Sequence, residues 1–141
     1  MPPPIFILLL ALSTASAGGG GTVPVLNVDN VREAAGTLWV GIYESEDDFL
    51  DRDKARLVSH RVTATGCEHV RIEGLVPGKA YAIAVFHDLN DNGELDTNFL
   101  GLPAEPWALS RPLRSWFRRP RFAEMSFVYD PRAGLPAVVL R

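Results

Sequence analysis

Apolar side chains recur at every second residue through most of this 141-residue chain, and this period constrains the fold more than any other feature. The clearest case is 80–86, where Tyr81, Ile83 and Val85 would face one side of a strand and alanines the other. Such a period is typical of strands buried on one face. We therefore predict an all-β fold, a single antiparallel β-sandwich of about seven strands, immunoglobulin-like or prealbumin-like, with a small barrel as the alternative. The other expected strands are 23–31, 37–43, 57–64, 69–72, 125–129 and 137–140.

The first residues of the chain predict export. An apolar run at 5–12 is too short to span a bilayer, which needs about 20 apolar residues, and Ala-Ser-Ala at 15–17 is a small-x-small cleavage signal. No Lys or Arg precedes the run, so the alternative is an apolar extension on a cytosolic protein. We expect a signal peptide at 1–17, a flexible glycine-rich leader at 18–22 and one β-sandwich domain at 23–141, secreted or periplasmic and without a transmembrane segment.

The chain has one cysteine and a net charge of −3 at pH 7. Because Cys67 cannot form an internal disulfide, core packing, with or without a metal, must hold an exported domain of this size together. We expect Cys67 to be a small buried apolar side chain rather than a reactive thiol. The small net charge does not indicate a charged partner, and nucleic acid is not an expected one.

Oxygen-bearing side chains alternate around one glycine just after the strand at 80–86. This is the pattern of an EF-hand-type loop, which supplies oxygen ligands to Ca²⁺ from alternate positions. Asp88, Asn90, Asn92 and Asp96 fall at positions 1, 3, 5 and 9, Gly93 falls at the sharp turn, and Glu94 would offer its backbone carbonyl. Position 12, which should be a bidentate Glu, is Phe99. We therefore predict that loop 88–98 binds Ca²⁺ weakly, at about 10⁻⁵–10⁻³ M, in a structural or adhesive role.

The same residues allow a simpler interpretation. Asn92-Gly93 is also a common hairpin signal, and Asp and Asn side chains bond to nearby backbone amides without any metal. If a cation does bind, Asn98 or Glu105 could replace the missing ligand. His87 is expected to be a strand-end residue, since Ca²⁺ avoids nitrogen ligands.

Residues 82–105 resemble the hallmark block of an uncharacterised exported bacterial family, domain of unknown function 2141. Residues 36–50 and 74–85 are similar to its early strand and its turn-and-strand block. The resemblance implies a signal peptide and a β-sandwich, and no established activity. After Glu105 the chain departs from the family's usual aromatic-glycine-phenylalanine-serine-asparagine stretch, although 122–127 resembles the block that follows it.

An arginine-rich segment with interleaved aromatic residues spans 107–121. Guanidinium groups bind carboxylates and phosphates in pairs and stack on rings, so this segment is an alternative binding site for a cell-envelope glycan or polyanion. A plain loop whose aromatic rings fold back onto the sandwich is the simpler interpretation. The candidate ligand-binding residues are Trp107, Arg111, Arg114, Trp116, Arg118 and Arg119.

No sequence motif indicates catalysis. The chain lacks a nucleophile elbow, a zinc-protease motif and a phosphate-binding glycine loop. The remaining catalytic possibility is a metal-dependent hydrolase using His87, Asp88 and Asp96, and we expect instead a non-catalytic protein.

Overall fold

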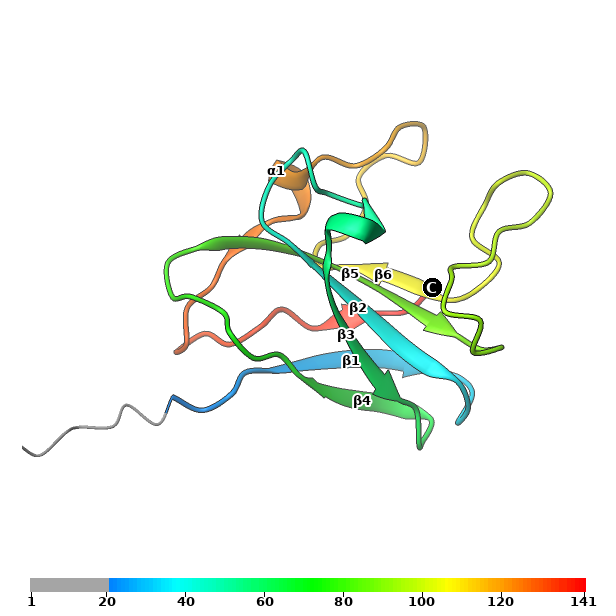
Figure 1. Ribbon diagram of the computed structural model, residues 1–141, viewed down its shortest axis with the longest axis horizontal. Coiled ribbons are helices and arrows are strands. Elements are labelled where there is room, and N and C mark those ends of the chain that lie inside the picture. The colour runs from blue at the N-terminus through cyan, green and yellow to red at the C-terminus, as the bar shows by residue number, and fades with distance from the viewer. Residues whose placement is uncertain (1–20) are drawn as a thin grey trace, which may run out of the picture.

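The computed structural model describes residues 21–141, so the predicted signal peptide and most of the predicted leader lie outside the described residues. Two β-sheets pack face to face (Figure 1). The larger sheet has the order β3-β2-β5-β6, with β7 also paired to β5, and the smaller has the order β4-β1-β8. The predicted all-β sandwich is confirmed. Its elements are β1 (Val25–Val31), β2 (Thr37–Tyr43), η1 (Arg52–Lys54), β3 (Arg56–Arg61), β4 (Gly66–Arg71), β5 (Ala80–Asp88), β6 (Trp107–Leu109), α1 (Phe122–Met125), β7 (Phe127–Val128) and β8 (Val138–Val139).

The core lies between the two sheets and follows the alternation read from the sequence. Tyr81, Ile83 and Val85 of β5 face inward, as predicted. Alternate residues of β2 in the same sheet, and of β1 and β4 in the other sheet, belong to the same cluster, among them Leu38, Val40, Ile42, Leu26, Val28 and Val70. Burial of these side chains is the main stabilising contribution expected for a domain without disulfides.

Two short strands, β6 and β8, close one edge of the sandwich, and β8 lies within the strand predicted at 137–140. The three-residue strand β6 was not expected, and β8 pairs with β1 in parallel, whereas the other strand pairs within residues 21–141 are antiparallel. Arg141, just beyond β8, exchanges two backbone hydrogen bonds with Trp107 of β6, at 3.0 and 3.4 Å. The end of the chain therefore joins the two sheets.

Cys67 is exposed, so its expected burial is wrong. On β4 the alternation directs Glu68 and Val70 inward and Cys67 and His69 outward. The inward position beside the cysteine is thus occupied by a carboxylate, which accepts hydrogen bonds from the ring of His60 at 2.8 Å and from two backbone N–H groups.

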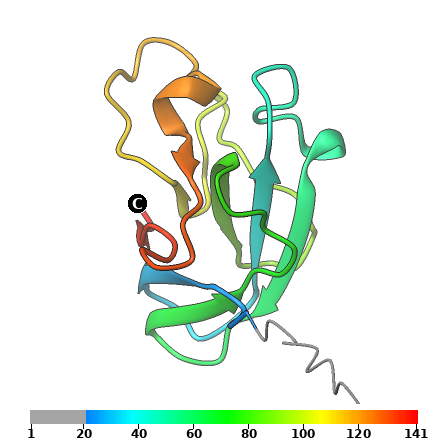
Figure 2. The same cartoon turned by 90° about the vertical axis from the view of Figure 1, so that its left-hand side faces the viewer.

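A second apolar cluster covers part of the outer face of the larger sheet. Tyr43 and Ala82, on β2 and β5, pack beneath Phe49 and Met125 from two long connections. The rings of Phe49 and Phe122 meet edge to face at 6.2 Å, and α1 accordingly lies beside the 44–51 turn in Figures 1 and 2. Two segments distant in sequence, 44–55 and 110–126, therefore cover part of this face of the sheet.

Candidate functional site

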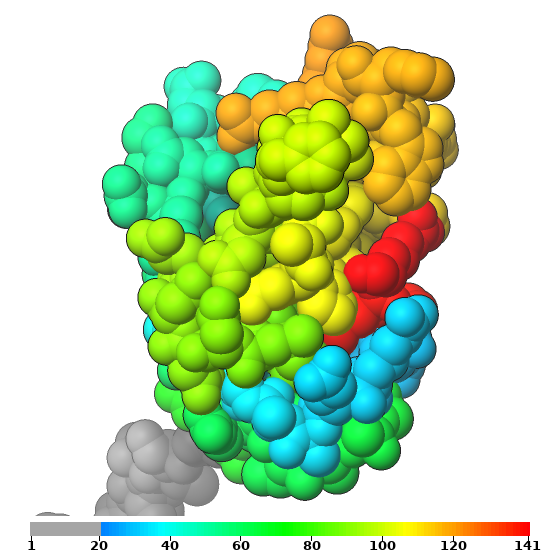
Figure 3. Space-filling model, turned by 90° about the vertical axis from the view of Figure 1, so that its right-hand side faces the viewer, coloured from blue at the N-terminus to red at the C-terminus, as the bar shows by residue number. Residues whose placement is uncertain are grey.

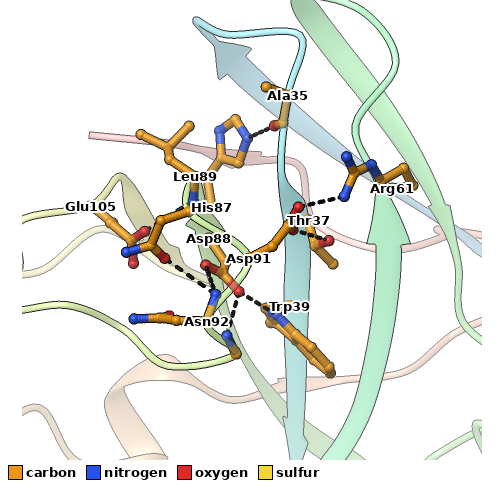
Figure 4. Close-up of polar contacts among 12 residues, drawn as sticks. Ala35, Thr37, Trp39, Arg61, His87, Asp88, Leu89, Asp91, Asn92 and Glu105 are labelled. Atoms are coloured by element: carbon orange, nitrogen blue, oxygen red, sulfur yellow. Dashed lines mark hydrogen bonds and ion pairs between the residues drawn. The ribbon is translucent and has the colours of Figure 1, made fainter.

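The candidate loop begins where β5 ends, and strand pairing fixes its starting point. Thr37 of β2 pairs with Asp88, the last residue of β5. Gly36, with a φ of +74°, packs so closely that a Cβ there would lie 2.1 Å from the Asp88 carbonyl oxygen. The ring of His87 bonds to the Ala35 carbonyl at 2.6 Å (Figure 4). His87 is thus a buried strand-end residue.

The Asp88 carboxylate organises the first turn of the loop. It is 1% exposed and accepts hydrogen bonds from the backbone N–H groups of Asn92 (3.1 Å) and Gly93 (2.7 Å). Trp39, on the outer face of β2, donates its indole N–H to the same carboxylate at 3.1 Å (Figure 4). The carboxylate at position 1 of the EF-hand-type pattern therefore binds the backbone N–H groups of positions 5 and 6, and these hydrogen bonds hold the chain in a tight turn.

Three of the predicted ligands converge on one point of the loop. The side-chain amide nitrogens of Asn90 and Asn92 donate to the two oxygens of Asp96, at 2.6 and 2.7 Å. Their amide oxygens accept the backbone N–H groups of Asn92 (3.2 Å) and Glu94 (2.9 Å). Glu94 itself is exposed. The partial positive charge of the two amides thus occupies the place beside Asp96 that a cation would take.

Glu105 braces the loop from within. Its two carboxylate oxygens accept the backbone N–H groups of Leu89 (2.9 Å) and Asp96 (3.1 Å), and it is largely buried. Asn98 accepts two backbone N–H groups at the tip of a small hairpin, and Phe99 projects into solvent. Both residues considered as replacement ligands therefore already have structural hydrogen bonds.

Asp91 points away from the convergent side chains. Its carboxylate accepts hydrogen bonds from the Thr37 hydroxyl at 2.8 Å and from Arg61 at 2.6 Å. The Thr37 hydrogen bond and then the Arg61 hydrogen bond hold the pKa of Asp91 below its usual range. Asp91 has a φ of +55° and Gly93 a φ of +76°, and the segment forms a compact turn. Asn92-Gly93 is not the centre of a two-residue hairpin, because the strand that follows the loop and pairs with β5 is β6, which begins only at Trp107.

The donor set determines which ions would suit the loop. Within residues 21–141, no three His, Cys, Asp or Glu side chains gather closely enough to hold a metal ion. A cation here would depend on the Asn90 and Asn92 amide oxygens, backbone carbonyls and water besides the Asp96 carboxylate. This all-oxygen set with few charges suits Ca²⁺ better than zinc, which takes nitrogen and sulfur ligands.

The arginines of segment 107–121 are mostly engaged within the fold. Arg118 forms a paired contact with Glu124, Arg111 donates to the Ser126 carbonyl at 2.8 Å, and Arg119 donates to the Phe49 carbonyl. The hydrogen bond from Arg118 is the main cause that lowers the pKa of Glu124 to about 2.

The aromatic residues of this segment divide into two groups. Trp107 is the first residue of β6, and its ring meets that of Trp116 edge to face at 6.1 Å. Trp116 is 67% exposed, and Phe117 is fully exposed beside it. Arg114 is also exposed. The structure thus brings Trp107 and Trp116 together but separates the arginines among different contacts.

A family model described as "Uncharacterized protein conserved in bacteria (DUF2141)" matches residues 26–133. The chain belongs to this family. The match runs from β1 to the turn before β8 and includes the whole candidate loop, so the resemblance read from the sequence is confirmed. Neither the curated proteins nor the solved structures include a match to the chain. In the part of the chain that the structure describes, no helix has the length and apolar character to cross a membrane.

The sequence did not predict the role of two residues that shape this DUF2141 loop. Gly36 sets the approach of β2 to Asp88, and Trp39 donates to the buried carboxylate. The alternation of apolar residues did indicate that Trp39 and Asp88 lie on the same face of the larger sheet. Trp39 lies on the outer face of β2 because Leu38 and Val40 point inward, and Asp88 has the same outward parity as Ala84 and Phe86 on β5.

Proposed function

We propose that this DUF2141 protein is an exported, non-catalytic β-sandwich protein whose loop 88–98 binds Ca²⁺ with low affinity in a structural or adhesive role. The observation that supports this most strongly is the convergence of Asn90 and Asn92 on both oxygens of Asp96. An anionic carboxylate flanked by two neutral amides, on a turn held by the buried Asp88, leaves a negative charge that a divalent cation would neutralise.

The loop accepts a cation by rotating two amides. The oxygen and nitrogen of an asparagine side chain exchange places in a half-turn, which would direct the amide oxygens of Asn90 and Asn92 toward the ion beside Asp96. This rotation gives up the hydrogen bonds that these oxygens accept from backbone N–H groups. That cost, together with the missing bidentate Glu at Phe99, accounts for an affinity in the range of about 10⁻⁵–10⁻³ M.

Calorimetric titration of the purified protein with CaCl₂ tests the proposal. We expect binding in that range by the wild type, loss of binding by Asp96→Asn, and retained binding by Asp91→Asn, a matched control because Asp91 faces Thr37 and Arg61 instead. Asp88→Ala alone is a poor test, since it also removes the acceptor for Trp39 and Gly93. No heat and no rise in melting temperature at several millimolar Ca²⁺ would rule the site out.

The burial of two candidate catalytic groups supports a non-catalytic role. His87 and Asp88 are each 1% exposed and hydrogen-bonded within the fold, so a hydrolase that needs them to reach a substrate has little support. A screen of esterase and phosphatase substrates should show no turnover above that of an Asp96→Ala variant. Turnover that this variant loses would reverse the assignment.

The alternative is a glycan- or polyanion-binding module built on segment 107–121. It is supported by the exposed pair Trp116 and Phe117 next to the exposed Arg114. Retention on a glycan or lipopolysaccharide array should fall when Arg114 and Trp116 are changed to Ala. Arg118 and Arg119 are less suitable targets, since their substitution also breaks contacts with Glu124 and Phe49. An array without any retained glycan would exclude this alternative.

A further inference from the structure

The outer face of the larger sheet is hollow at its centre. One row of cross-strand neighbours on this face runs from Leu57 of β3 through Gly41 of β2 and Ala84 of β5 to Leu109 of β6. The two central positions carry no side chain and a methyl group, whereas the next row along the strands contains Phe86 and Trp107. Small residues flanked by large ones leave a depression in the sheet surface.

Loops convert this depression into a pocket. A cavity of about 380 Å³ lies over the hollow, and its lining is almost entirely apolar. This volume falls within the range of about 300–1,000 Å³ typical of small-molecule sites. The walls come from three segments that are distant in sequence: Leu95 and Pro103 from loop 88–105, Leu113 and Pro120 from the 110–121 segment, and Leu50 from the 44–55 connection. In Figure 3 the yellow-green loop lies toward the viewer, with the blue-green 44–55 connection on one side of it and the orange segment on the other.

Two polar groups stand at this apolar pocket. Tyr43 folds back over Gly41, so that a Cβ on the glycine would lie 3.0 Å from the tyrosine hydroxyl. Burial and then Asp51 raise the pKa of Tyr43 more than Arg119 and Arg52 lower it, so the hydroxyl stays protonated at neutral pH and can donate a hydrogen bond.

The second polar group belongs to Arg52, which is one of the residues that line the pocket. Its guanidinium carbon lies 5.4 Å from the centroid of the Trp39 ring, beside the pocket. Within residues 21–141, Arg61 and Arg118 form ion pairs with carboxylates, whereas Arg52 forms none. An unpaired guanidinium beside apolar walls presents a planar pair of donors to an anion that arrives with a hydrocarbon body.

We propose that this pocket binds a small amphiphilic carboxylate, with its hydrocarbon chain in the hollow over Ala84, beside the Tyr43 ring that covers Gly41, and its carboxylate paired with Arg52. The chain gains from leaving water for an apolar lining, and the carboxylate matches the two-donor geometry of the guanidinium. The Tyr43 hydroxyl, which lies over Gly41, is a further hydrogen-bond donor at the pocket. No part of this assignment depends on a cation in loop 88–98.

Binding of decanoate, with decanol as the neutral probe of the same chain length, tests both halves of the site. We expect decanoate below its micelle-forming concentration to bind the wild type by calorimetry and to change the fluorescence of the protein, since Trp107 lines the pocket. Arg52→Gln should weaken decanoate binding at least about tenfold and leave decanol binding unchanged. The control Arg71→Gln, on the outward face of β4 in the other sheet, should change neither.

Filling the hollow should abolish binding of both probes. Ala84→Phe places a ring where the chain would lie, and Ala84→Leu, a smaller filling, serves if the first variant does not fold by circular dichroism. Three results would overturn the proposal: no decanoate binding by the wild type, equal decanoate affinity in Arg52→Gln, or undiminished binding in both Ala84 variants. Association only with lipid vesicles, without binding of dissolved decanoate, would overturn it as well.

Discussion

Replacing Gly36 by alanine should destabilise the protein strongly, and the structure gives the two causes separately. Gly36 has a φ of +74°, which costs an L-residue about 1–2 kcal/mol. The new methyl carbon would also lie 2.1 Å from the Asp88 carbonyl oxygen and 3.0 Å from Leu89 Cα. Because these are backbone atoms at the end of a paired strand, they yield less easily than a side chain, and overpacking of this kind costs about 1–3 kcal/mol. We expect the free energy of unfolding to fall by about 2–5 kcal/mol.

Gly134→Ala is the matched control for this substitution. Gly134 has nearly the same φ, +72°, but an added Cβ there would meet no atom within 4 Å. It therefore incurs only the conformational cost, about 1–2 kcal/mol. Urea unfolding followed by tryptophan fluorescence measures both variants, and Trp39 reports directly on Asp88. Equal losses of stability in the two variants would refute the claim that Gly36 is required by its contact with Asp88.

Three further predictions concern ionisable groups outside the candidate loop. Burial favours a higher pKa for Glu68, but hydrogen bonds from His60 and from backbone amides outweigh it and lower the pKa from 4.5 to about 2. Its contribution to the free energy of unfolding, about 1–3 kcal/mol, is therefore present above pH 4.5 and lost as the pH falls toward 2; a stability difference between wild type and Glu68→Gln that stays constant from pH 7 to 3 would contradict this. Glu124→Gln should lower the melting temperature less in high salt than in low salt, since its pair with Arg118 is solvent-accessible. The Asp29 carboxylate raises the pKa of the Cys67 thiol, so iodoacetamide at pH 7 should alkylate Cys67 more slowly than free cysteine, despite its exposure.

The long paired strands were predictable because their residues alternate over many positions. In β5 the inward side chains Tyr81, Ile83 and Val85 are separated by alanines, and the structure follows this pattern. The two-residue strand β8 lies within the strand predicted at 137–140, but the three-residue strand β6 was not predicted, because so short a segment does not establish a period. Their position depends on contacts with distant residues, such as those between Trp107 and Arg141.

The candidate loop was only partly predictable for a different reason. Alternation indicates that Asp88, Asn90, Asn92 and Asp96 can converge, and the last three do. Sequence spacing cannot tell whether a carboxylate binds backbone amides, an indole or an ion, and Asp88 binds the first two. The apolar pocket has no local pattern in the sequence, since its lining comes from four strands and three connecting segments that only the folded chain brings together.

Leu95 lies between Glu94 and Asp96 in the loop and also forms a wall of the apolar pocket. A single segment therefore contributes to both of the proposed sites. If an ion held by Asp96 and a hydrocarbon resting on Leu95 favour the same loop conformation, each must tighten the binding of the other by an equal factor, because coupling between two equilibria is reciprocal. The protein would then sense two chemically unrelated solutes through one short stretch of backbone. Their dissociation constants, measured separately and together, would give the strength of that coupling.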